Sequence, residues 1–117
     1  MKVYISRNIP SDAIEVLKEY GLEVAINSEN KKLTQQELID ACQNADLLLN
    51  VGHADLDKYF LESCKQLRGI ALASVGYDHV DLETATALRI PVSNTPDVLS
   101  GATADVAFLL MLAVSRK

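Results

Sequence analysis

The chain has 117 residues, 49% of them hydrophobic and 23% charged, which suits a single domain with one ordinary core. Its net charge of −5 and thinly spread basic residues argue against a nucleic-acid partner. The first residues lack the apolar core of a secretory signal, and the one long apolar run is about half of the roughly 20 residues that a membrane span needs. We therefore expect a cytoplasmic protein that binds neither nucleic acid nor membrane.

Two predicted strands and a helix open the chain. The strands cover residues 2–6 and 22–26, each short and apolar enough for a sheet. The helix between them begins after Pro10 and runs from Ser11 to Tyr20. Gly21 follows directly, at the position where a helix end favours a left-handed residue.

The second predicted helix has the clearest start signal. Thr34 and Glu37 have the spacing of a capping box, in which each side chain satisfies a backbone N–H of the other residue. Leu33 and Leu38 flank this start at the spacing of a hydrophobic staple. The face that should point inward carries Leu38, Ala41 and Cys42.

Two continuous apolar runs, residues 46–50 and 69–74, predict strands that are buried on both faces. Between them we expect a helix that is capped by Asp55. Its inward-facing residues should be Leu56, Tyr59 and Phe60.

The last third of the chain predicts two helices and a short strand. Asp81 should cap a helix that carries Leu82, Ala85 and Leu88. The strand at 90–94 contains Pro91, which lacks a backbone donor, so we expect this strand at a sheet edge. Ser100 should cap a final apolar helix over residues 100–117.

Five strands that alternate with helices indicate an α/β fold built from right-handed βαβ units. A chain of this length favours a flavodoxin-like three-layer sandwich, with a parallel five-stranded sheet in the order 2-1-3-4-5.

Ligands of such folds bind at the carboxyl ends of the strands, which here draws attention to two loops. Gly52 and His53 follow the third predicted strand, and Val75 and Gly76 follow the fourth. Successive exposed backbone N–H groups around a glycine can bind an anion such as a carboxylate. The alternative that Gly76 only makes the turn stays open.

The two histidines and two cysteines of the chain give no clear prediction of function. His53 and His79 lack a partner acid nearby in the sequence, so both are interpreted as solvated loop residues, although His53 can also line a pocket. Cys42 and Cys64 lack zinc-site spacing and should be reduced thiols, and no metal site is predicted. The sequence also contains no GxGxxG loop, Walker loop or GxSxG motif.

Residues 74–117 carry the loop SVGYDHVD, the turn IPVSNTP and the triplet TAD at the start of an apolar helix. This combination resembles the D-isomer-specific 2-hydroxyacid dehydrogenases, in particular the glyoxylate/hydroxypyruvate reductase or glycerate dehydrogenase branch. The resemblance implies that residues 1–98 are a segment of the catalytic, substrate-binding domain. Residues 99–117 would be an inter-domain helix that crosses toward a Rossmann NAD(P)-binding domain outside this sequence.

The resemblance also implies roles for individual residues. Backbone N–H groups of Val75 and Gly76 would bind the substrate carboxylate, Gly52 and His53 would wall the same pocket, and Thr103 would contact the nicotinamide end of the cofactor. The family's catalytic arginine, glutamate and histidine have no counterpart among these residues. We therefore expect no catalytic residue in this chain and no dehydrogenase activity from it alone.

The implied parent enzyme would be a homodimer that uses NAD or NADP to reduce a small 2-keto acid to a 2-hydroxy acid. The 117-residue chain alone should bind no cofactor and should self-associate through the helix at 99–117. Two other hypotheses stay open: a stand-alone flavodoxin-like module that binds a small carboxylate, and an interaction domain built around the apolar helix.

Overall fold

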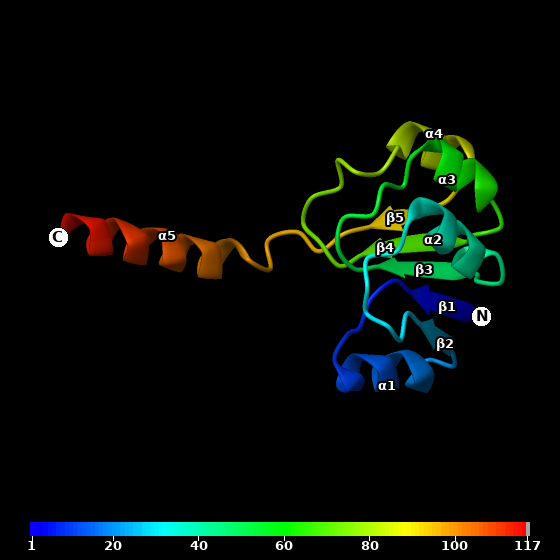
Figure 1. Cartoon of the computed structure of the whole chain (residues 1–117), viewed down its shortest axis with the longest axis horizontal. Helices are drawn as coiled ribbons and strands as arrows, with labels where there is room; N and C mark the ends of the chain where they lie inside the picture. The colour runs from blue at the N-terminus through cyan, green and yellow to red at the C-terminus, as the bar shows by residue number, and fades with distance from the viewer. Residues whose placement is uncertain (117) are drawn as a thin grey trace.

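Five parallel strands form one sheet in the order β2-β1-β3-β4-β5, as the computed structural model, which describes residues 1–116, shows (Figure 1). The strands are β1 (Lys2–Ile5), β2 (Glu23–Ile26), β3 (Leu47–Asn50), β4 (Gly69–Leu72) and β5 (Val92–Ser93). The helices are α1 (Ser11–Glu19), α2 (Gln35–Cys42), α3 (Lys58–Ser63), α4 (Leu82–Ala87) and α5 (Ser100–Ser115). This confirms the predicted fold class and strand order, with the strand that follows Pro91 at one edge.

Helices lie on both sides of the sheet, with α2, α3 and α4 on one side and α1 on the other (Figure 1). The main core lies under α2–α4, where the fully buried side chains include Leu38, Leu48, Phe60, Leu61 and Leu72. On the other side, α1 packs along β2. The part of that side over β3 and β4 is an open apolar groove of about 360 Å3, which Leu47, Leu49 and Ala71 help to line.

Two predicted helix boundaries are confirmed in atomic detail. Gly21 has a φ of +76°, and its N–H donates to the Lys18 carbonyl while the Leu22 N–H donates to the Leu17 carbonyl, which together form a Schellman motif. At the start of α2, the Thr34 hydroxyl accepts from the Glu37 N–H at 3.2 Å, and the Glu37 carboxylate accepts from the Thr34 N–H at 2.8 Å. The capping box therefore forms as the sequence predicts.

The predicted start of α3 is wrong by two residues, because Asp57 and not Asp55 caps the helix. The Asp57 carboxylate accepts from the Phe60 N–H at 2.9 Å. Leu56 cannot join the helix because it forms a parallel bridge to Val80. The later start rotates the helix, so that Tyr59, expected inside, is 58% exposed.

Asp81 caps α4 as expected, since its carboxylate accepts from the N–H and the hydroxyl of Thr84. These two bonds lower the pKa of Asp81 below its ordinary value. The predicted cap of the last helix is wrong. Ser100 is the first residue of α5, Leu99 occupies the N-cap position, and no side chain caps the helix.

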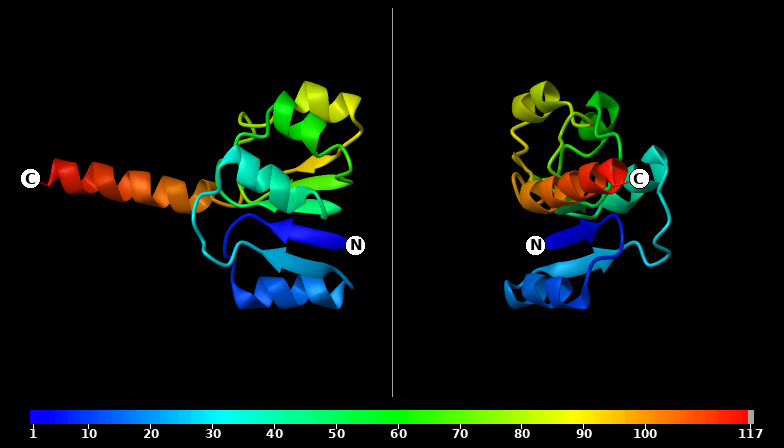
Figure 2. Two further views of the ribbon diagram at one scale, coloured as in Figure 1. Left: turned by 45° about the vertical axis from the view of Figure 1, so that its right-hand side comes forward. Right: turned by 90° about the vertical axis from the view of Figure 1, so that its left-hand side faces the viewer.

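Helix α5 projects from the sheet into open space, and its residues are exposed along their described length (Figures 1 and 2). The exposed side chains include Phe108, Leu109, Leu110 and Met111, each with about 60% of its surface accessible. Such a continuous apolar surface usually marks an interface. None of the helices within residues 1–116 combines the length and apolarity needed to cross a membrane.

Replacing the α2 cap tests the capping box. Thr34→Ala should lower the free energy of unfolding by about 1 kcal/mol, because the Glu37 N–H loses its acceptor. The measurement is equilibrium urea denaturation of the chain. Thr34→Ser is the matched control and should retain most of the stability, since serine caps helices as well as threonine does. Equal losses in both variants would contradict this account of the cap.

Candidate functional site

The loops after β3 and β4 lie side by side because their strands are neighbours in the sheet. Asn50 at the end of β3 is in register with Leu72 at the end of β4, and the Ala73 N–H continues the pairing by donating to the Asn50 carbonyl at 2.9 Å. Farther along, the bridge between Leu56 and Val80 joins the far ends of the same two loops. The loops are thus fastened to each other at both ends.

In the β4 loop, protein groups hold the carbonyls while the N–H groups stay free. The Asn94 side-chain amide donates to the Val75 carbonyl at 2.8 Å, and the Ser74 hydroxyl donates to the Gly76 carbonyl at 2.9 Å. Within residues 1–116, the N–H groups of Val75 and Gly76 have no hydrogen-bond acceptor. Both residues are exposed, so the loop can offer two backbone donors to an anion.

Positions 52 and 76 differ in whether their backbone conformation requires a glycine. Gly52 has a φ of +94°, a left-handed conformation that other residues rarely adopt. Gly76 has no such conformation, and a Cβ placed there would lie 3.3 Å from a carboxylate oxygen of Asp78. The backbone conformation of the turn therefore does not by itself require a glycine at position 76.

The two histidines, which come from different loops, meet at this edge of the sheet. The rings of His53 and His79 pack edge to face, with their centroids 5.1 Å apart. His53 is exposed, as expected for a solvated loop residue. His79 differs from that expectation, because both ring nitrogens are buried and have no hydrogen-bond partner in the described part of the chain.

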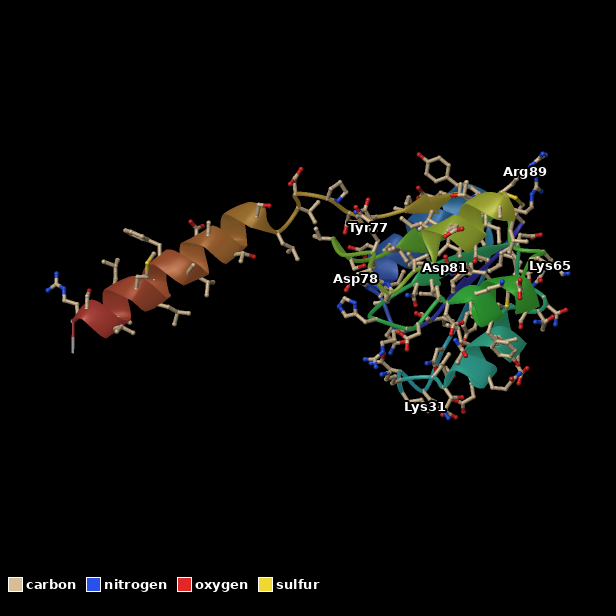
Figure 3. The ribbon with its side chains drawn as sticks, turned by 90° about the horizontal axis from the view of Figure 1, so that it is seen from above. Lys31, Lys65, Tyr77, Asp78, Asp81 and Arg89 are labelled. Carbon is tan, nitrogen blue, oxygen red and sulfur yellow. The ribbon has the colours of Figure 1, made fainter. Side chains whose placement is uncertain are left out.

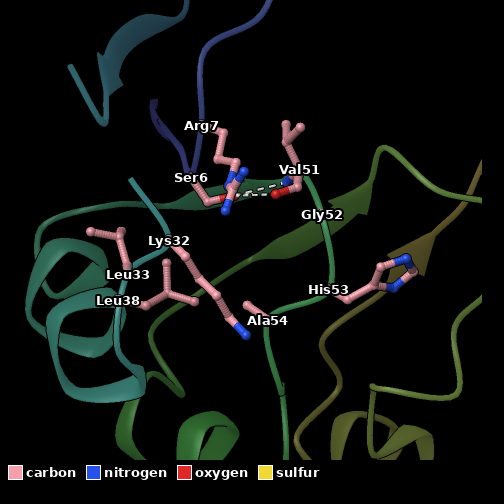
Figure 4. A pocket seen from close by; sticks show the side chains of 9 residues that line it. All are labelled: Ser6, Arg7, Lys32, Leu33, Leu38, Val51, Gly52, His53 and Ala54. Atoms are coloured by element: carbon pink, nitrogen blue, oxygen red, sulfur yellow. Dashed lines mark hydrogen bonds between the residues drawn. The ribbon is translucent and has the colours of Figure 1, made fainter. Parts of the chain in front are cut away.

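A pocket of about 270 Å3 opens beyond the ends of β1 and β3 (Figure 4). Gly52 and His53 line it together with Ser6, Arg7, Lys32, Leu33, Leu38, Val51 and Ala54. The pocket thus contains two of the predicted site residues, whereas Val75 and Gly76 lie outside its lining. Sequence reasoning missed Arg7 and Lys32; the only available signal was the position of Arg7 directly after the first strand.

A buried hydroxyl joins the two strands that frame this pocket. The Ser6 side chain, 5% exposed, accepts from the Val51 N–H at 2.8 Å and points its own hydrogen toward the Asn50 amide oxygen and the Val51 carbonyl. Asn50 is fully buried, and its side-chain nitrogen has no partner within residues 1–116. The hydroxyl of Ser6 therefore holds the start of the β3 loop against β1.

The remaining predicted residues lie apart from the pocket. Thr103 is exposed on α5, where its N–H donates to the Leu99 carbonyl within the first turns of the helix. Cys42 and Cys64 are free and buried, and a hydrogen bond to Cys64, together with burial, raises the pKa of the Cys42 thiol. Among the described residues, no group of three His, Cys, Asp or Glu side chains is arranged to hold a metal ion.

Residues 3–116 match the family described as D-isomer specific 2-hydroxyacid dehydrogenase, catalytic domain. The chain belongs to this family. It is 40% identical over 115 residues to a glyoxylate reductase of Pyrococcus furiosus, and over 116 residues to one of Thermococcus kodakarensis. These alignments cover 98% and 99% of the chain but 34% of each relative, so the chain spans about a third of their length.

A solved structure supports the same assignment. A protein of Thermus thermophilus is 40% identical to this chain and superposes with a TM-score of 0.89. The match covers 99% of this chain and 37% of that one. The resemblance predicted from the VGYD loop, the SNTP turn and the TAD triplet is therefore confirmed at the level of the dehydrogenase family.

Removing the hydroxyl of Ser6 tests its role as the link between β1 and the β3 loop. Ser6→Ala should lower the free energy of unfolding by about 1 kcal/mol, because the partly buried Val51 N–H loses its acceptor. Thermal and urea unfolding give the measurement. Ser28→Ala is the control, since Ser28 is exposed and its hydroxyl makes no hydrogen bond within residues 1–116. A loss no larger than that of the control would refute this role.

Proposed function

We propose that this chain is the N-terminal substrate-binding segment of an NAD(P)-dependent oxidoreductase that reduces 2-keto acids to D-2-hydroxy acids. The observation that carries the proposal is the β4 loop, in which Val75 and Gly76 keep two free N–H groups while their carbonyls are held in place. Membership of the dehydrogenase family and the similarity to glyoxylate reductases add support, and favour small substrates such as glyoxylate or hydroxypyruvate.

Within this reaction the chain would bind and orient the substrate. Two N–H donors can hold a carboxylate in one orientation, which fixes the position of the adjacent carbonyl carbon. The β3 loop, with Gly52 and His53, would limit the space beside it, because the His53 ring packs against His79 of the β4 loop. Reduction of a ketone also needs a hydride donor and a proton donor, and we assign neither role to a residue of this chain.

The residues of this chain do not fit a complete nicotinamide cofactor site. The sequence contains no GxGxxG loop to cradle the pyrophosphate, and Thr103 on the exposed helix α5 is the one residue that we assign to the cofactor. We therefore propose that NAD or NADP binds only in the parent protein. Residues 99–117 would lead there to a Rossmann domain, and the parent would be a cytoplasmic homodimer.

The exposed apolar surface of α5 supports this arrangement, because a helix with such a surface needs a protein partner. Phe108, Leu110 and Met111 lie in open space in the described chain. The second domain would cover them in the parent. When the chain is alone, we expect a second copy to cover them instead.

An activity assay tests whether this chain binds substrate without carrying out hydride transfer. The purified 117-residue chain should not oxidise NADH or NADPH with glyoxylate, hydroxypyruvate or pyruvate, because we assign it no hydride-transfer or proton-transfer site. Absorbance at the nicotinamide band follows the reaction. Turnover by this chain alone would contradict the proposal. A coding sequence that continues past residue 117 into a GxGxxG loop would support it.

A second candidate function is a stand-alone module that binds a small carboxylate. The free N–H groups of the β4 loop favour it, since they need no second domain to form. Both functions predict carboxylate binding by this chain. The coding sequence after residue 117 separates them, because a stop codon there favours the module.

Loosening the β4 loop tests the carboxylate site under either function. Asn94→Ala removes the bond to the Val75 carbonyl and should weaken the binding of D-lactate about threefold to tenfold. Amide shifts of Val75 and Gly76 in NMR titrations report the affinity. Asn44→Ala is the matched control, because Asn44 is exposed and its side chain makes no hydrogen bond among the described residues. Unchanged D-lactate binding by Asn94→Ala would argue against the assigned loop.

A further inference from the structure

Two basic side chains share the pocket beyond β1 and β3, and the proposed function assigns them no role. Arg7 follows the end of β1, and Lys32 lies in the segment that leads to α2 (Figure 4). Figure 4 shows Lys32 reaching toward Ala54, while His53 points away from both cations. Among residues 1–116, the pocket lining includes no aspartate or glutamate.

Neither cation forms an ion pair with a side chain of the described chain. Within residues 1–116, no carboxylate oxygen lies within 4.0 Å of the charged groups of Arg7 or Lys32. The acids nearest in sequence to Lys32 are already engaged, because Glu29 and Glu37 both pair with Lys31, at 3.1 and 3.4 Å. In a chain with a net charge of −5, two unpaired cations at one pocket make it locally attractive to anions.

The backbone that carries the two cations is held by a buried amide. Asn27, 7% exposed, donates through its side-chain nitrogen to the Ser6 carbonyl at 3.1 Å and to the Lys31 carbonyl at 2.8 Å. Ser6 and Lys31 directly precede Arg7 and Lys32. One buried side chain therefore links the two segments, so the fold fixes the backbone from which Arg7 and the exposed Lys32 extend.

Gly52 lies beside the guanidinium of Arg7. A Cβ at Gly52 would lie 4.0 Å from Nε of Arg7, which is ordinary van der Waals contact. Gly52 also has a left-handed φ of +94°, which a side chain would strain. Arg7 is half-buried, and partial removal from water strengthens its attraction to an anion.

We propose that Arg7 and Lys32 bind a second anionic group of the substrate, a carboxylate or a phosphate at the end remote from the 2-keto acid. This inference rests on the proposed function, in which Val75 and Gly76 take the first carboxylate. The two places lie on loops that touch, because the β3 loop, which lines the pocket, packs against the β4 loop through the rings of His53 and His79. A substrate with an acid group at each end is then preferred over glyoxylate and hydroxypyruvate, which carry a single acid group, although the reaction type of the proposed function stays the same.

Binding to the 117-residue chain tests the proposal without turnover. D-malate repeats D-lactate with a carboxylate in place of a methyl hydrogen, and D-3-phosphoglycerate offers a phosphate at the same end. Both should bind at least about tenfold more tightly than D-lactate, as expected for charge-assisted hydrogen bonds. Their relative affinities distinguish a carboxylate from a phosphate preference.

Charge-neutral variants test whether Arg7 and Lys32 cause the tighter binding of the dianions. Arg7→Gln and Lys32→Gln should each lose most of the preference for the dianions and leave D-lactate affinity unchanged. Lys65→Gln is the matched control, since it removes the same charge at an exposed site that is not part of the pocket lining. Figure 3 shows Lys65 on the far side of the domain from Tyr77 and Asp78. The proposal is overturned if dianions bind no more tightly than D-lactate, or if Lys65→Gln weakens them as much as Lys32→Gln does.

A titration with inorganic phosphate separates this proposal from the proposed function. Saturable shifts at Arg7 and Lys32 that vanish in Arg7→Gln would establish the anion site, even if D-lactate failed to shift Val75 and Gly76. In that case the substrate-binding role of the β4 loop would be refuted, and the anion site would still be supported. The absence of both phosphate binding and a preference for dianions would refute the anion site, whatever D-lactate does.

Discussion

The parallel pairing of β3 with β4 is the constraint on which the proposed ligand-binding edge of this protein depends. The register that aligns Asn50 with Leu72 brings both strands to an end at the same level, so the two loops begin side by side. The bridge between Leu56 and Val80 closes the loops at their far ends. Because both ends are held by backbone hydrogen bonds, the intervening N–H groups can remain free for a ligand without loss of the fold.

Polar side chains, of which Ser6 and Asn27 are buried, extend this constraint to the rest of the edge. Ser6 links β1 to the β3 loop, Asn27 links β1 to the segment before α2, and Asn94 links the β5 loop to the β4 loop. Each satisfies backbone groups that no strand partner reaches. Loops that would otherwise be mobile are therefore held in one arrangement, which is what orientation of a small substrate requires.

The molecule is asymmetric in how well its apolar surface is covered. Under α2–α4 the side chains are buried, whereas the groove over β3 and β4 on the other side and the whole of α5 remain open. The two open surfaces are apolar, and the chain spans about a third of the length of its curated relatives. The fold thus keeps the proposed ligand-binding edge intact while presenting two open apolar surfaces.

Local spacing and element order were enough to predict the capping box at Thr34, the left-handed helix end at Gly21 and the order of the strands, and the motifs of residues 74–117 were enough to predict the family. The start of α3 was misplaced for a long-range reason, because the bridge from Leu56 to Val80 is not visible in local spacing. Two features came from the three-dimensional arrangement alone: Arg7 and Lys32 share a pocket, and the ring of His79, with its nitrogens buried, packs against His53. Strand register and buried amides set these contacts, which join residues more than 20 positions apart.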